Sequence, residues 1–287
     1  MLTPEELRQI QRLSVQAGRR VDSLFAGGYR SAFKGRGMEF EEVRPYVEGD
    51  DVRHIDWNVM ARTDEAHVKV FQEERELTIM LAIDVSGSMN FGSGGADGFT
   101  DKKKQQARIA GALAYAAIRN NDRVGLLCFS DRVELFVPPR KNRGHAWRII
   151  QEVFTHSPEG RRTDVGVALE ELSRSLKRRA VVCVVSDFLG ENPRRALSVL
   201  SARHRTHCFV VSDPLETSSK NVGLIELEDA ESGERVLLDS RDWSPQKWHG
   251  QREAELRKSG ALVSTISTES DPFLALMRHF RNAERRR

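Results

Sequence analysis

The spacing of apolar residues along the chain changes near Leu77. Before this point, apolar residues recur every three or four positions from Leu7 to Leu24, which predicts an amphipathic helix ending at residues 27–28. Three short runs with partly alternating apolar and polar residues follow: MEFEEVRPYV, HIDWNVMAR and AHVKVFQEE. Turn-rich and polar residues separate these runs, so they predict a small antiparallel β element.

From Thr78 onward, short apolar strands alternate with helical stretches. The predicted strands are TIMLAID, DRVGLLCFS, VELFVPP, AVVCVVSD, THCFVVSD and ALVSTIST. The predicted helices lie around residues 104–119, 145–154, 164–176 and 194–202, with a terminal helix from residue 271. Strands that are apolar on both faces and separated by helices form a mostly parallel sheet covered on each side. We therefore expect a doubly wound α/β fold.

These patterns divide the chain into two regions. Residues 1–77 hold the N-terminal helix and the small β element, and residues 78–287 hold the α/β domain. Within the second region, residues 223–240 break the alternation with two strand-like runs that flank a Glu-Ser-Gly-Glu turn. This segment predicts a hairpin inserted before the last helix–strand pair.

Composition is that of a soluble globular protein. The chain has 287 residues, 39% hydrophobic and 30% charged, which suits one large α/β domain with an appendage or two domains. No apolar run approaches the roughly 18 residues needed to cross a bilayer, and the N-terminus lacks the apolar region and cleavage site of an export signal. We expect a cytoplasmic protein. Cys128, Cys183 and Cys208 lie inside apolar, β-branched runs, which indicates reduced core thiols instead of disulfides or zinc ligands.

The charge balance does not indicate a nucleic-acid partner. The chain carries 45 basic and 42 acidic side chains, a formal charge of +3. Basic clusters occur at residues 102–104, at residues 140–143 and at the C-terminus, but no aromatic residues interleave them. We interpret these clusters as solvated surface.

The first buried strand of the α/β region ends in a group of polar residues, in the stretch TIMLAIDVSGSMNFG. Asp84 closes the strand, and Ser86 and Ser88 follow with Gly87 between them, which lets the backbone turn back. In open α/β sheets, ligands bind outside the carboxyl ends of the strands. A carboxylate and two hydroxyls are hard oxygen donors, which suit Mg²⁺ or Mn²⁺ at roughly 2.0–2.2 Å better than zinc. The stretch therefore predicts part of a metal site.

Two further oxygen donors should reach the same edge of the sheet. Thr163 opens a helix in EGRRTDVGVALEEL, and Asp187 ends a strand in VVCVVSDFLG. Each residue also has an ordinary structural interpretation: the serines form turns, Thr163 caps a helix, and Asp187 closes a strand. Together, in this order, the set resembles the metal-ion-dependent adhesion site of von Willebrand factor type A domains. The resemblance covers the chain from Thr78 to the last helix and implies five metal ligands: Asp84, Ser86, Ser88, Thr163 and Asp187.

The preceding region extends this resemblance. The run RSAFKGRGMEFEEVRPYVEGDDVRHIDWNVMART, followed by HVKVFQEERELTIMLAIDVSGSM, resembles the bacterial domain of unknown function 58 family. Members carry such a region directly ahead of a type A domain. The resemblance implies a partner, because members are often encoded beside MoxR-type AAA+ ATPases, which are thought to act as chaperones with type A proteins as adaptors. Many relatives carry membrane helices, and we expect none in this chain.

Other candidate chemistry is weaker. Asp50, Asp51 and Asp56 follow a turn signal and have arginines nearby as ion-pair partners, so we do not interpret them as a second metal site. The chain has no H-E-x-x-H, G-x-S-x-G or G-x-x-x-x-G-K-[ST] motif, and no base that would activate Ser86 is evident. His145 fits a solvated or capping role better. We therefore do not expect an enzyme.

Three functions remain open at this stage. The first is a binding module whose five ligands do not fully enclose the ion, so that a Glu or Asp of a partner protein completes the site. The second is a metal-assisted hydrolase that acts on a phosphoester. The third is nucleic-acid binding through the basic clusters, which a steep salt dependence would support.

Overall fold

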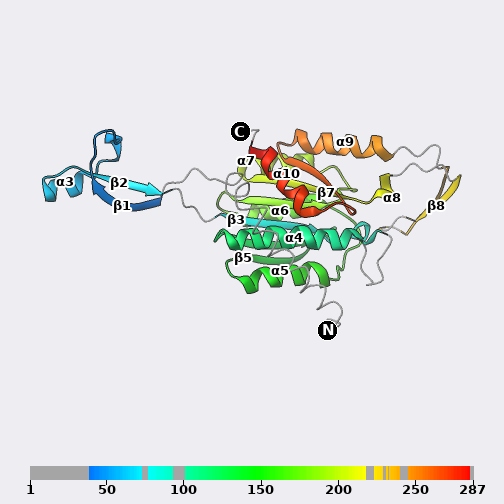
Figure 1. The fold of residues 1–287 in the computed structure, drawn as a ribbon. Coiled ribbons are helices and arrows are strands. Elements are labelled where there is room, and N and C mark those ends of the chain that lie inside the picture. The colour runs from blue at the N-terminus through cyan, green and yellow to red at the C-terminus, as the bar shows by residue number, and fades with distance from the viewer. Residues whose placement is uncertain are drawn as a thin grey trace. The chain divides into compact units, whose positions relative to one another are not determined.

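The computed structural model describes residues 39–72, 77–92, 101–217, 223–228, 231, 233–239 and 245–284 (Figure 1). Contacts between residues divide the chain into two compact units. The smaller unit contains the described residues before Thr78, and the larger unit contains those from Thr78 onward. The predicted helix over residues 7–24 lies outside the described residues.

The smaller unit contains an antiparallel strand pair, β1 (Glu39–Pro45) and β2 (His67–Gln72). A bulge between Phe40 and Glu42 shifts the register of β1. These strands come from the first and third of the three predicted runs, so the small antiparallel β element is confirmed for those two runs. A 3-10 helix (Val52–His54) also lies between the two strands.

The prediction that the middle run belongs to the β element is wrong for most of its length, because HIDWNVMAR contributes α3 (Trp57–Thr63), whereas Ile55 forms an isolated antiparallel bridge with Val68 of β2. The Asp56 carboxylate accepts hydrogen bonds from the backbone N–H groups of Asn58 and Val59, which have no partner within the helix. At the other end, Asp64 adopts the left-handed conformation, with φ of 59°. These caps stabilise a two-turn helix where the alternation of a short run was ambiguous.

The larger unit is built on a six-stranded sheet with the order β10-β7-β6-β3-β4-β5. Its strands are β3 (Thr78–Asp84), β4 (Arg123–Phe129), β5 (Val133–Arg140), β6 (Val181–Ser186), β7 (Arg205–Ser212) and β10 (Leu262–Ser267). All neighbours are parallel except β4 and β5. The chain adds β4 on one side of β3 and later β6 on the other. The carboxyl end of β3 is therefore a topological switch point, where ligands bind in such folds.

Helices cover both faces of this sheet (Figure 1). On one face α4 (Asp101–Arg119) packs against α5 (Arg143–Thr155) and α10 (Pro272–Glu284). On the other face α7 (Arg194–Arg203) packs against α6 (Val165–Ser175) and α9 (Pro245–Lys258). The predicted doubly wound, mostly parallel α/β fold is confirmed.

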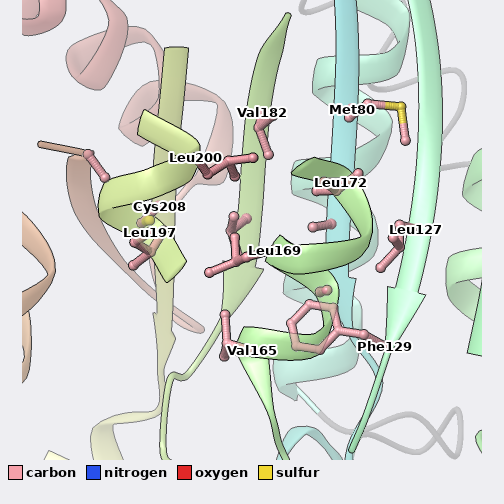
Figure 2. Close-up of a cluster of buried hydrophobic side chains, with 14 of the residues drawn as sticks. Met80, Leu127, Phe129, Val165, Leu169, Leu172, Val182, Leu197, Leu200 and Cys208 are labelled. Carbon is pink, nitrogen blue, oxygen red and sulfur yellow. The ribbon is translucent and has the colours of Figure 1, made fainter. Parts of the chain in front are cut away.

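A continuous apolar core lies between the sheet and the second helix layer. Figure 2 shows Leu169 and Leu172 of α6 and Leu197 of α7 in one cluster with Met80, Val182 and Cys208 of the sheet. Each side chain of this size stabilises the fold by roughly 1.5–3 kcal/mol when it is fully buried. The core thus holds the sheet rigid directly beneath the carboxyl edge.

The three cysteines of the chain are free and buried within this unit. Cys208 belongs to the core cluster in Figure 2, and burial raises its thiol pKa to about 12. Burial also raises the pKa values of Cys128 and Cys183. These observations confirm the prediction of reduced core thiols.

Beyond β7, the chain forms the short helix α8 (Pro214–Thr217) and then an antiparallel hairpin. The hairpin consists of β8 (Leu224–Glu228) and β9 (Arg235–Asp239), with Leu224 opposite Asp239 and Glu228 opposite Arg235. Its strands fall within the predicted segment 223–240. None of the helices in the described part of the chain combines the length and apolar character that a membrane span requires.

Candidate metal centre

The five residues implied as metal ligands lie together at the carboxyl edge of the sheet. Asp84 is the last residue of β3, and Ser86 and Ser88 lie at the start of a 3-10 helix (Gly87–Asn90). Thr163 precedes α6, and Asp187 follows β6. All five side chains are buried, and Asp84 is 0% exposed.

The three hydroxyl groups form a contiguous chain. Thr163 Oγ1 lies 2.7 Å from Ser86 Oγ, within hydrogen-bond distance, and Ser86 Oγ lies 3.1 Å from Ser88 Oγ. Neighbouring ligands of an octahedral Mg²⁺ lie about 3 Å apart, because each lies about 2.1 Å from the ion at right angles to the next. The spacing of these oxygen atoms therefore fits a shared hard cation.

The Asp84 carboxylate is wholly buried beside a second acid. Its Oδ1 accepts from the backbone N–H of Ser86 at 3.0 Å, and its Oδ2 accepts from Ser186 Oγ at 2.5 Å. Burial, followed by the negative charge of Asp187, raises the pKa of Asp84 to about 7, although these hydrogen bonds oppose the shift. A divalent cation would relieve this repulsion, so the donor set fits the metal in charge as well as in spacing.

The helix cap of α6 and a close approach of Gly190 define the surroundings of Thr163. The helix cap of α6 is Asp164, whose carboxylate accepts from the N–H of Gly166 at 2.8 Å, so the interpretation of Thr163 as the cap is wrong. The Thr163 hydroxyl is directed to Ser86 instead. Behind this loop lies Gly190, where a Cβ atom would approach the carbonyl oxygen of Thr163 to 2.6 Å.

The Asp187 loop carries local backbone strain. Asp187 Oδ1 accepts from the N–H of Leu189 at 3.0 Å, which turns the chain immediately after β6. Phe188 adopts a φ of 54°, a conformation that is unfavourable for a bulky side chain. Such strain is common where a loop must present a functional group.

Lys102 is a site residue that the sequence analysis missed. It was interpreted as part of a solvated cluster, but its side chain is 0% exposed. Its Nζ lies 2.9 Å from Asp187 Oδ2 and also forms an ion pair with Glu216 of α8. Burial alone would lower the pKa of Lys102, but the charges of Asp187 and Glu216 raise it above its ordinary value. Burial lowers the pKa of a second cation, Arg252 of α9, although the charges of Asp187 and Glu216 oppose this shift.

Glu231 is the second missed residue. It lies on the turn between β8 and β9, and its Oε2 accepts from the backbone N–H of Thr163 at 3.2 Å. The hydroxyl of Thr163 donates to its Oε1. No signal in the sequence could have paired these residues, which are 68 positions apart.

Three aspartates of the smaller unit form ordinary ion pairs. Asp50 pairs with Arg44 at 2.7 Å and Asp51 with Arg53 at 2.7 Å, as the sequence suggested. Asp56 pairs with Lys69 at 3.3 Å. Among the described residues, no group of three or more His, Cys, Asp or Glu side chains is arranged to bind a metal. The adhesion-type set differs because three of its five donors are hydroxyls.

Two further features bear on catalysis: the position of His145 and the contacts of Ser86. His145 is buried with its Nε2 2.8 Å from the carbonyl oxygen of Val124, so its role is structural and not the solvated or capping one that was expected. The hydrogen bonds recorded for the Ser86 hydroxyl are to Thr163 and Ser88, neither of which is a base.

Known proteins resemble this chain in sequence and in fold. Residues 42–258 match the family described as "Protein of unknown function DUF58". The uncharacterized protein Rv1480 of Mycobacterium tuberculosis is 33% identical over 233 residues, which cover 80% of this chain and 72% of that protein.

Solved structures extend the comparison to the fold. The crystal structure of the hypothetical protein BatB from Bacteroides thetaiotaomicron matches 73% of this chain and 99% of its own, with a TM-score of 0.50 and 13% identity. The VWA domain of SpRpn10 matches 71% of this chain and 94% of its own, with a TM-score of 0.42 and 9% identity. The predicted type A-like fold is confirmed by the sheet topology and the BatB likeness. With a family match over most of its length, the chain belongs to the DUF58 family.

Proposed function

We propose that this protein is a metal-dependent protein-binding module. Asp84, Ser86, Ser88, Thr163 and Asp187 would hold a Mg²⁺ ion, or Mn²⁺, and a Glu or Asp of a partner protein would bind to it. The observation that carries the proposal is the buried cluster of three touching hydroxyls beside Asp84, a carboxylate whose pKa is raised to about 7. When bound, the ion supplies an electrophilic position for a carboxylate oxygen.

The residues of the chain perform distinct tasks in this proposal. The hydroxyls contribute oxygen without charge, so the ion keeps its attraction for an acidic partner. Asp84 and Asp187 anchor it from two adjacent strands, and the core beneath them keeps the edge rigid. A serine-nucleophile mechanism is disfavoured because the hydrogen bonds recorded for Ser86 Oγ are to Thr163 and Ser88, neither of which is a base.

The family resemblance supports a particular partner. We propose a MoxR-type AAA+ ATPase, or a client of one, as the protein that presents the acidic residue. A pull-down with such an ATPase should succeed with Mg²⁺ and fail with EDTA. Binding that persists in EDTA would contradict a metal-dependent contact.

The metal itself is tested by calorimetric titration of Mg²⁺ into the wild-type protein and Asp84→Asn. We expect saturable binding in the wild type and its loss in the variant, since the amide keeps the shape of Asp84 without its charge. Asp51→Asn is the matched control, because Asp51 belongs to the smaller unit, where it is paired with Arg53. Thermal melts establish that all three proteins fold. Equal Mg²⁺ binding in wild type and Asp84→Asn would refute the site.

A further inference from the structure

We infer that Glu231 of the β8–β9 hairpin is the protein's own carboxylate ligand for this site and takes the place of the partner's acid until a partner displaces it. The inference rests on the proposed function, because it concerns the same metal. It adds a sixth residue to the site and a step to partner binding.

The position of Glu231 carries the inference. Its two carboxylate oxygens contact the backbone N–H and the hydroxyl of Thr163. That hydroxyl lies 2.7 Å from Ser86 Oγ, so the Glu231 carboxylate directly contacts one end of the chain of hydroxyls. This is the chemistry that the proposed function requires from a partner, supplied from within the chain.

Part of the apolar surface of the hairpin faces solvent. Its strands expose apolar side chains, with Leu224 68% and Leu237 64% exposed. Arg235 pairs with Glu228 across the strands at 2.9 Å, a contact within the hairpin itself. An isolated two-stranded hairpin is only marginally stable in water. The contact of Glu231 with Thr163 therefore helps to fix where the hairpin lies, and movement of the hairpin would not remove a residue from the core cluster.

The arrangement implies competition between an internal and an external ligand. A tethered carboxylate acts at an effective concentration on the order of millimolar. A partner binds only to the fraction of molecules in which Glu231 has left, which lowers its apparent affinity by that fraction. Removing Glu231 should therefore weaken Mg²⁺ binding to the free protein while making the site more accessible to an outside acid.

The experiment combines Mg²⁺ calorimetry with amide hydrogen exchange of residues 224–228 and 235–239. The proteins are wild type, Glu231→Gln and the control Glu226→Gln, which removes an exposed acid from the same hairpin. In wild type and Glu226→Gln, Mg²⁺ should slow exchange of the hairpin several-fold relative to EDTA. In Glu231→Gln the slowing should disappear and the Mg²⁺ Kd should rise roughly tenfold.

The outcomes separate this inference from the proposed function. Mg²⁺ binding of equal affinity in wild type and Glu231→Gln, with equal hairpin exchange, would overturn the inference and leave the metal site standing. Absence of Mg²⁺ binding in the wild type would overturn both. Slowing that persists in Glu231→Gln would show that the hairpin responds to the ion through another group and would also overturn the inference.

Discussion

Lys102 is a buried cation beside the proposed metal position. Its ammonium group neutralises part of the charge of Asp187 and Glu216, and a metal ion bound to Asp187 would meet it as a like charge. Lys102 and the ion should thus compete electrostatically for the same carboxylate. The two cations need not exclude one another, because Glu216 remains available to Lys102.

Replacing Lys102 by methionine tests this competition, since methionine keeps the apolar stem and removes the charge. In EDTA, the free energy of unfolding should fall by about 3–5 kcal/mol, because buried carboxylates lose their partner. The Mg²⁺ affinity should rise roughly tenfold, because a like charge near the ion is gone. Urea unfolding with and without Mg²⁺, together with calorimetry, measures both effects. Lys104→Met on the same helix is the control, and an unchanged Mg²⁺ affinity in Lys102→Met would contradict the competition.

Gly190 should affect metal binding without contributing a donor. The Cβ of Gly190→Ala would lie 2.6 Å from the carbonyl oxygen of Thr163, so the Thr163 loop must move. We expect a loss of about 1–3 kcal/mol in stability from this overpacking and a roughly tenfold weaker Mg²⁺ affinity from the displaced hydroxyl. Calorimetry and thermal melts check both. Gly250→Ala, where no atom lies within 4 Å of the added Cβ, should lose neither.

At the scale of single residues, part of the candidate site could be predicted from sequence. Its five residues lie at the ends of strands, in the loops that follow them or before a helix, and parallel strands bring such positions to one edge of a sheet: Asp84, Ser86, Ser88, Thr163 and Asp187. Lys102 could not be recognised, because α4 begins at Asp101 and directs this one lysine of the cluster inward. Glu231 could not be recognised because its contact with Thr163 depends on how the hairpin folds back.

At the scale of elements, a buried histidine pair joins the edge of the sheet to the last helix. His207 of β7 lies 2.7 Å from His279 of α10 between their ring nitrogens, and Ser264 of β10 contacts the other nitrogen of His279 at 2.6 Å. Phe280 packs edge-on against His207. Burial, followed by the charges of His279 and Arg205, lowers the pKa of His207 well below its ordinary value.

The stability of this contact should depend on pH. The folded protein keeps His207 neutral, whereas the unfolded chain binds a proton below pH about 6.5. Because the unfolded state then holds more protons, the free energy of unfolding should fall as the pH drops through that value toward the lower folded pKa. Thermal melts from pH 8 to 5 at saturating Mg²⁺, wild type beside His207→Gln, measure the effect. The wild type should lose stability more steeply, and parallel curves would contradict the assignment.

The elements differed in how well their patterns predicted them. Long amphipathic helices and strands buried on both faces were recognisable, because their periodicity extends over many residues. The run containing α3 was too short for its period to be distinguished, and the hydrogen bonds from the Asp56 carboxylate favoured the helix. The hairpin was predicted from its turn, but the contact of that turn with Thr163 was not, since strand pairing does not specify where the turn packs.

At the scale of the whole molecule, the order of strands and helices after Thr78 fixed the fold class before any contact was known. The antiparallel edge strand β5 follows β4 after only three residues, residues 130–132, which is too short for a parallel crossover. The pattern could not predict the order of the strands in the sheet. That order places β4 and β6 on either side of β3 and so makes the carboxyl end of β3 the place where the donors meet.

The three buried thiols have a practical consequence for studying this protein. Thiol reagents react with thiolates. All three cysteines are buried and their thiol pKa values are raised, so the cysteines of the folded protein should not react with such reagents. A single cysteine introduced on the exposed surface of β9 would then accept a fluorophore or spin label in an otherwise wild-type background. The rate at which the native thiols react would in turn report how often the core opens, because these thiols become reactive only in the opened state.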